Sequence, residues 1–240
     1  MTKTSTRNDG VALPAQSQSL RNKLMFAASA GILAMVAPSG FYGMRAEAQK
    51  LPDECLDTDP NDPNAVTNNI AQDGETLECI APDPATPIDP FYTNARDLTI
   101  QVGGVGADPA STVIGSATLD ERALSMTGPG VQTLEIRESG SIINNATGSV
   151  NTTVNIDAEG SISLTNRGVI DNQSNQTGEN GDLAVRTKVT QGGGDLVIDS
   201  TDGRVLGGVY VYSYGNGKVD LDFGEITSTS GDEGLYVYPL

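Results

Sequence analysis

The sequence predicts an all-β protein that folds as a right-handed parallel β-helix. Short stretches rich in β-branched residues alternate between apolar and polar positions, and Gly, Asn, Asp and Ser separate them, as strands and turns require. Examples are residues 98–102 (LTIQV), 131–136 (VQTLEI) and 150–156 (VNTTVNI). No stretch after the N-terminal apolar run has helical periodicity over about 11 residues. Two short phrases also recur, and a recurring unit favours a solenoid.

Residues 1–48 are expected to be a secretory signal peptide. Basic residues precede a 14-residue apolar run over 24–37, and Ala46 and Ala48 then supply the small residues that signal peptidase accepts. A membrane-spanning helix needs about 20 apolar residues, so an uncleaved anchor is the less favoured alternative, as is a short core helix. We expect export by the Sec machinery and cleavage after Ala48.

Residues 49–92 form an acidic, proline-rich segment. They hold more than half of the twelve prolines, which interrupt helices and central strands, so we expect an irregular segment. The only two cysteines, Cys55 and Cys79, lie here. In an oxidising compartment such a pair predicts a disulfide, whereas a zinc site would need further cysteines or histidines that the chain lacks.

Residues 93–240 are expected to form the β-helical repeats. The first phrase is aliphatic-x-aliphatic, a polar turn, and Gly-x-Ile or Gly-x-Val. It occurs at 134–142 and, 20 residues later, at 154–162, and again at 196–205 and 219–226. We expect coils of 20 to 26 residues that stack through parallel strands. A β-sandwich also has short strands, but it does not require one phrase to recur in register.

The second phrase places tyrosines at alternate positions. Residues 208–212 (GVYVY) match residues 234–238 (GLYVY) at a shift of 26, and residues 182–185 match more weakly another 26 upstream. At this shift Tyr210 stacks on Tyr236 and Tyr212 stacks on Tyr238. If the valines point inward, the tyrosines form an exposed row suited to contacts with a sugar or another partner; if the tyrosines point inward, they fill the core.

Charge and composition exclude several functions. Removal of residues 1–48 leaves nine basic and 29 acidic residues, a net charge near −20, which disfavours binding to nucleic acid. The chain has no histidine, so Ser-His-Asp and Cys-His nucleophile systems are excluded. A glycan-cleaving site built on two carboxylates remains an alternative. A cleft that contains two carboxylates and a basic residue such as Arg186 or Arg204 would indicate such a site. No catalytic residue, cofactor or metal is expected.

The chain resembles the N-terminal region of an autotransporter (type V secretion) passenger. The resemblance depends on the long leader ending at Ala46 and Ala48, the nearby cysteine pair and the Gly-aliphatic-Tyr units with Gly-rich turns. It implies an exposed β-helical stalk that acts as an adhesin or a structural element at the cell surface or outside the cell. The family's translocator barrel is not expected within this chain, so self-anchoring in the outer membrane does not carry over.

Three functions remain open from the sequence. The first is a non-enzymatic, surface-displayed passenger with a glycan or cell-surface partner. The second is a carbohydrate-active β-helical enzyme. The third is a truncated passenger without an independent function.

Overall fold

The structure is a computed structural model, and the chain divides into two compact units, Met1–Gly43 and Met44–Leu240. All of the residues that it describes lie in the second unit. They are residues 51–58, 70–81, 86–104, 112–116, 122–145, 152–173, 183–214, 216–227 and 234–239. The predicted signal peptide, with Ala46 and Ala48, lies outside these residues.

The described residues form sixteen strands and no helix, which confirms the prediction of an all-β protein. The strands are β1 (Cys55–Asp57), β2 (Thr76–Cys79), β3 (Phe91–Thr93), β4 (Thr99–Val102), β5 (Thr112–Ser116), β6 (Leu124–Gly128), β7 (Gln132–Ile136), β8 (Gly140–Asn144), β9 (Val154–Ala158), β10 (Ile162–Asn166), β11 (Val169–Asn172), β12 (Leu183–Val189), β13 (Leu196–Leu206), β14 (Gly208–Ser213), β15 (Val219–Thr227) and β16 (Leu235–Pro239).

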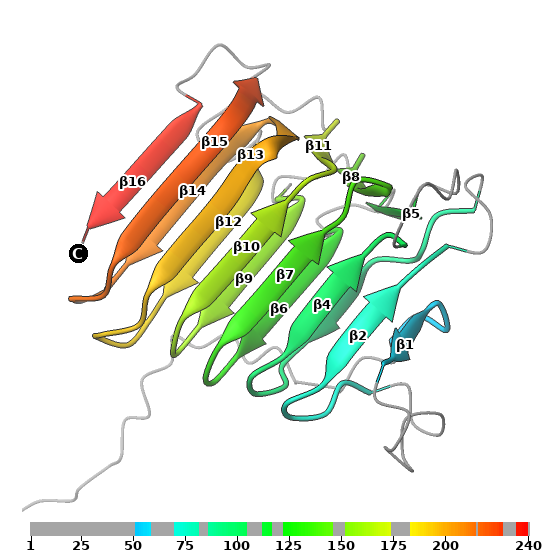
Figure 1. Ribbon diagram of the computed structural model, residues 1–240, viewed down its shortest axis with the longest axis horizontal. Helices are drawn as coiled ribbons and strands as arrows, with labels where there is room; N and C mark the ends of the chain where they lie inside the picture. Colours follow the sequence, from blue (N-terminus) through cyan, green and yellow to red (C-terminus); the bar gives the residue numbers. More distant parts are fainter. Residues whose placement is uncertain are drawn as a thin grey trace, which may run out of the picture. The chain divides into compact units, whose positions relative to one another are not determined.

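These strands make two sheets (Figure 1). The ten-stranded sheet has the order β1-β2-β4-β7-β10-β13-β11-β8-β5, with β15 also paired to β13. The long strand β13 joins its two halves, because its first residues pair with β10 and its last residues pair with β11. The six-stranded sheet has the order β16-β14-β12-β9-β6-β3. Every pairing between these strands is parallel except that of β1 with β2.

Up to β12, two consecutive strands of the ten-stranded sheet are followed by one strand of the six-stranded sheet, and from β13 onward single strands of the two sheets alternate. We call each such group of consecutive strands a layer, and strands of one layer pair with those of the neighbouring layers. Leu134 pairs with Leu164, which pairs with Ile198, at separations of 30 and 34 residues. The expected pairing of 134–136 with 154–156 is therefore wrong, because 134–136 lie in the ten-stranded sheet and 154–156 in the six-stranded one. The similarity of the two phrases reflects the same inward–outward alternation in two different sheets.

The tyrosine phrase has the expected register. Strand β14 pairs with β16 so that Tyr210 lies beside Tyr236 and Tyr212 beside Tyr238. The weaker third copy also pairs with β14, but Val185 lies beside Val209, a separation of 24 rather than 26. The difference arises from an irregularity between Leu183 and Val185 that shifts the register.

The inward-facing side chains of both sheets form one apolar core. Leu134, Leu164 and Ile198 from the ten-stranded sheet are at most 1% exposed, as is Ile156 from the six-stranded sheet. Full burial of one such side chain contributes about 1.5–3 kcal/mol. The core therefore stabilises each layer through its contacts with the layers on both sides.

Glycines allow the turns of successive layers to approach closely. A Cβ atom at Gly160 would lie 2.4 Å from the carbonyl oxygen of Gly130, and one at Gly194 would lie 2.0 Å from that of Gly160. Both distances are too short for any side chain. Glycine is thus required where these turns stack on one another.

Residues 49–92 are more regular than expected. They contain β1, β2 and most of β3, and β2 lies inside the ten-stranded sheet between β1 and β4. The predicted disulfide is present and joins Cys55 to Cys79 across the β1–β2 pair, with 4.0 Å between the Cα atoms. The prediction of an irregular segment was wrong for β2, because Leu77 and Cys79 alternate with polar residues over only four positions.

Candidate functional site

The outer face of the six-stranded sheet carries the tyrosines. Val209 and Val211 are completely buried in the core, so Tyr210 and Tyr212, which alternate with them, point to the other side of the sheet. The structure therefore supports the first of the two predicted orientations. Tyr92 on β3 lies in the same outward row, since the chain of paired residues runs from Tyr92 through Ser125 and on to Tyr210.

The tyrosine rings of β14 and β16 contact one another. The centroids of Tyr210 and Tyr236 are 4.5 Å apart, and those of Tyr212 and Tyr238 are 5.1 Å apart with an angle of 11° between the ring planes. Tyr236 and Tyr238 have nearly parallel planes, at 5°, and centroids 6.5 Å apart. These distances lie in the range in which aromatic pairs attract each other.

The four predicted binding residues are not equally accessible. Tyr210 is only 7% exposed, whereas Tyr238 is 41% exposed. Tyr212 and Tyr236 are intermediate, and Tyr214, which continues the row, is 37% exposed. Tyr210 therefore supports the others, and a partner would meet mainly Tyr212, Tyr214, Tyr236 and Tyr238.

Basic side chains adjoin the tyrosines. The Arg186 guanidinium lies 5.5 Å from the centroid of the Tyr212 ring, and its Nη1 donates to Asn155 Oδ1 at 2.6 Å and to Asp157 Oδ1 at 3.1 Å. The Lys188 ammonium lies 5.4 Å from the centroid of the Tyr214 ring. Both contacts fall within the range of cation–π attraction.

Arg122 is a third basic residue on this face and lies near β3, at the edge of the six-stranded sheet opposite β16. Its backbone N–H donates to the Tyr92 hydroxyl at 3.4 Å. Burial lowers the pKa of the Arg122 guanidinium, and the like charge of Arg186 lowers it further, while Asp157 opposes the change. We call Arg122, Arg186, Lys188 and the tyrosines of β14 and β16 the aromatic–basic surface.

The alternation of valine and tyrosine predicts the tyrosines of this surface but not their basic neighbours. The sequence suggests Arg186 only as part of a catalytic cleft, and it does not indicate that Lys188 and Asp157 lie beside the tyrosines. The sequence does indicate that the two basic residues share one face of β12, because Val185, Thr187 and Val189 alternate with them. Their position beside the tyrosines depends on the pairing of β12 with β14.

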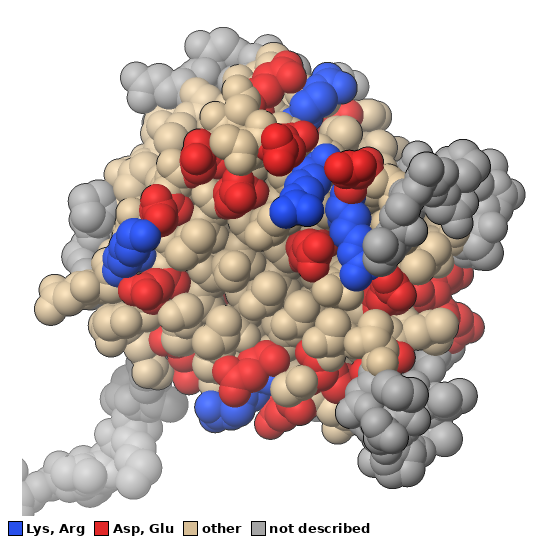
Figure 2. Space-filling view, viewed as in Figure 1, with Lys and Arg blue, Asp and Glu red and all other residues tan. Residues whose placement is uncertain are grey.

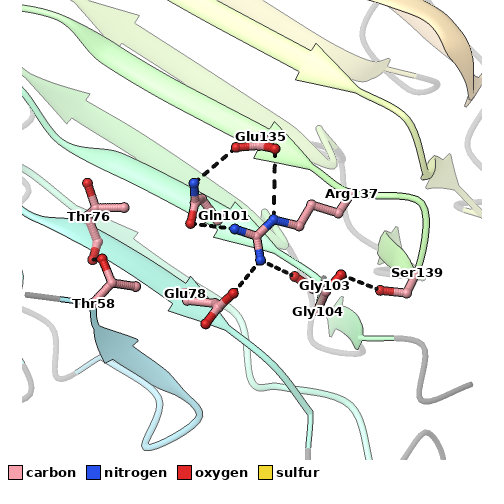
Figure 3. A network of polar contacts seen from close by, with 9 residues as sticks. All are labelled: Thr58, Thr76, Glu78, Gln101, Gly103, Gly104, Glu135, Arg137 and Ser139. Atoms are coloured by element: carbon pink, nitrogen blue, oxygen red, sulfur yellow. Dashed lines mark hydrogen bonds and ion pairs between the residues drawn. The ribbon is translucent and has the colours of Figure 1, made fainter. Parts of the chain in front are cut away.

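A polar network on the outer face of the ten-stranded sheet centres on Arg137 (Figure 3). Its guanidinium pairs with Glu78, donates to Gln101 Oε1 at 2.7 Å and lies 3.8 Å from Glu135 Oε1. Gln101 Nε2 in turn donates to Glu135 Oε2 at 3.0 Å. The two carboxylates are thus held in ion pairs that connect β2, β4 and β7, which is a structural arrangement rather than an acid–base pair.

Arg186 and Arg204 do not mark a catalytic cleft in the described residues. Arg186 pairs with Asp157, and Arg204 lies 3.5 Å from Glu225 in an exposed ion pair. A depression of about 330 Å³ lies elsewhere, beside β2. It is lined by Asp57, Thr58, Gln72, Asp73, Gly74, Glu75 and Thr76. Asp73 there accepts a hydrogen bond from the Arg96 backbone at 2.8 Å.

No cluster of three or more His, Cys, Asp or Glu side chains in the described residues could hold a metal ion. That same part of the chain has no helix long and apolar enough to cross a membrane.

Figure 2 shows one face of the molecule, on which acidic side chains outnumber basic ones and both surround an uncharged strip.

Comparison of the chain with protein-family models, with curated proteins and with solved structures finds no match.

Proposed function

We propose that this chain is an exported passenger of the autotransporter type, a right-handed parallel β-helix that displays a binding surface as an adhesin or structural stalk. The parallel, in-register pairing of each strand with the next layer supports the β-helical winding. The right-handed sense follows the strong preference of parallel strand connections. The role is binding rather than catalysis.

The observation that carries the proposal is the aromatic–basic surface. Six of the seven tyrosines of the chain, all except Tyr42, lie on the outward side of the six-stranded sheet. Tyrosines that only filled space would be expected in the core, where the inward positions hold Val209 and Val211 instead. Tyrosine combines apolar area with a hydroxyl group, which suits contacts with a glycan or a cell-surface protein.

Export is supported by two independent features. The leader over 1–48 has the order of a signal peptide, and the Cys55–Cys79 disulfide is compatible with an oxidising compartment. Expression of the full chain in a Gram-negative host tests this part. The purified product should begin at Gln49 by mass spectrometry, and replacing Ala48 with Arg should block cleavage. A full-length product with an intact leader and reduced cysteines would contradict export.

Binding is tested with the chain after export. Purified protein should adhere to cells or immobilised glycans, and Tyr212→Ala with Tyr238→Ala should reduce adhesion several-fold. Leu56→Ala is the matched control, because Leu56 is 63% exposed and lies on the ten-stranded sheet. Equal adhesion of the tyrosine variant and the wild type would contradict a role for this surface.

A further inference from the structure

The charge around the tyrosines is opposite to that of the whole chain. Nine Lys and Arg residues follow position 48, and three of them, Arg122, Arg186 and Lys188, lie on the outer face of the six-stranded sheet around Asp157. On the ten-stranded sheet, by contrast, Asp199 and Asp222 are direct neighbours in register. The aromatic–basic surface is therefore a locally positive region on a protein with a net charge of −17.

Acidic groups on the other sheet do not cancel this local charge. The two sheets lie on opposite sides of the shared core, and packed sheets are separated by about 10 Å. At physiological ionic strength, charges more than about 8 Å apart across solvent are largely screened. Within the strands of the six-stranded sheet, the charged residues are Arg186, Lys188 and Asp157.

Arg186 has hydrogen-bonding capacity for such a ligand. Each hydrogen bond that it makes with a described residue comes from Nη1, to Asn155 and Asp157. A guanidinium has five N–H donors, and Nη2 with Nε forms an edge that a carboxylate can accept in a bidentate manner. The Arg186 side chain is 25% exposed, so part of it is within reach of solvent.

The tyrosines of β14 and β16 provide a contact area for a sugar next to Arg186. The planes of Tyr212, Tyr236 and Tyr238 are close to parallel, with angles of 11° and 5°. Tyr212 has Tyr238 stacked on one side at 5.1 Å and the Arg186 guanidinium 5.5 Å from its centroid. A pyranose ring would therefore contact the outward edges and hydroxyl groups of these tyrosines, while its carboxylate extends along the same face of the sheet towards Arg186 and Lys188.

We propose that the aromatic–basic surface binds an acidic oligosaccharide, with a sugar ring against the outward edges of Tyr212, Tyr236 and Tyr238 and its carboxylate on Arg186 and Lys188. This ligand class rests on the proposed binding function. It is narrower than that function, since a neutral glycan or a protein could use the same tyrosines without the cations.

Titration calorimetry of the full, exported chain with two probes tests the proposal. The probes are trigalacturonate and its methyl ester, in which a methyl group on each carboxyl group removes the charge. The acid should bind at least about tenfold more tightly than the ester, the change expected for loss of a charge-assisted contact. Raising the salt concentration should weaken binding of the acid and leave the ester unchanged.

Single substitutions test whether Arg186 and Lys188 supply the positive charge that favours the acid over the ester. Arg186→Gln and Lys188→Gln should each weaken binding of the acid about tenfold and leave the ester unchanged. Lys188→Gln leaves the Arg186–Asp157 pair in place, so it tests the charge even if Arg186→Gln alters the fold. Arg204→Gln, on the ten-stranded sheet, is the control and should bind like the wild type.

Two outcomes would overturn the proposal in distinguishable ways. Equal affinity for acid and ester, lost in Tyr238→Ala, would reject the acidic class and retain the tyrosine surface as a binding site. Absence of binding of either probe at concentrations on the order of 10 mM would reject an oligosaccharide ligand. In that case the adhesion assay with the tyrosine variant would still decide the broader function.

Discussion

The first and last layers of strands differ in how well their inward-facing residues are covered. In the first layer, Leu77 is 2% exposed and Cys79 is 0% exposed, and the antiparallel strand β1 covers the edge of β2. In the last layer, Val219, Leu235 and Val237 are 38%, 37% and 44% exposed. Figure 1 shows β1 and β16 at opposite ends of the row of strands.

Two valines that are paired in neighbouring strands show what causes this difference in exposure. Val211 and Val237 are the same residue at paired positions of β14 and β16, yet Val211 is 0% exposed and Val237 is 44% exposed. The strand pattern is identical, so only the number of neighbouring layers differs. Burial in this fold therefore comes from contact with layers on both sides, and the last layer should contribute less free energy of folding than an inner one.

The largest expected effect comes from the turn glycines. A methyl group at Gly160 would clash with Gly130, and Gly160 also has the turn of Gly194 on its other side. Gly160→Ala should lower the free energy of unfolding by about 3 kcal/mol or more, measured by urea denaturation. Gly217→Ala clashes with Gly194 but should cost less, since the last layer can move outward. Equal losses would show that the last layer is held as rigidly as an inner one.

The disulfide should be the main stabiliser of the first layer. It closes a loop with a sequence separation of 24 residues, which predicts about 3 kcal/mol from the lost entropy of the unfolded chain. The double variant Cys55→Ala, Cys79→Ala should lose about this amount in urea denaturation, and reductant should have no further effect on it. A loss below about 1 kcal/mol would indicate that β1 is held by its strand pairing alone.

Paired valines measure the difference between the layers directly. Val211→Ala should lower the free energy of unfolding by about 2 kcal/mol, because it removes two buried methyl groups and leaves a cavity. Val237→Ala should cost less than about 1 kcal/mol, since its side chain is already 44% exposed. A similar cost for both would mean that another surface covers β16 in solution.

The smallest effect concerns an exposed carboxylate of β13. Hydrogen bonds from the Thr201 side chain and backbone lower the pKa of Asp199 below its ordinary value of 3.8. A lowered native pKa stabilises the fold above pH 3.8, and this contribution is lost as the pH falls through the native pKa. Thr201→Val should raise the pKa of Asp199 towards 3.8 in an NMR titration. An unchanged pKa would assign the shift to the backbone hydrogen bond or to Arg167.

The sequence predicts those structural features that depend on residue spacing within a short piece of the chain. Alternation of Val209, Tyr210 and Val211 predicts opposite faces, and the structure decides which face points inward. The disulfide was predictable because only two cysteines exist. The shift of 26 residues between the tyrosine phrases gave the correct register, since no irregularity interrupts the β14–β16 pairing.

The same patterns could not identify neighbours where turns vary in length. Residues 134–136 and 154–156 look equivalent because a period of two is the same in every strand, yet they belong to different sheets. The position of Arg186 beside Tyr210 likewise depends on the irregularity between Leu183 and Val185. The aromatic part of the candidate site was therefore predictable, and its basic part was not.

The amino-acid sequence by itself thus determined the all-β class, the disulfide and the tyrosine register, because each follows from spacing along a short piece of chain. Only the tertiary structure decided which layers stack, which tyrosines stay accessible and which cations stand beside them. Those outcomes depend on contacts between residues about 30 positions apart, such as Arg186 with Asn155, and turn length and register set such contacts rather than local pattern.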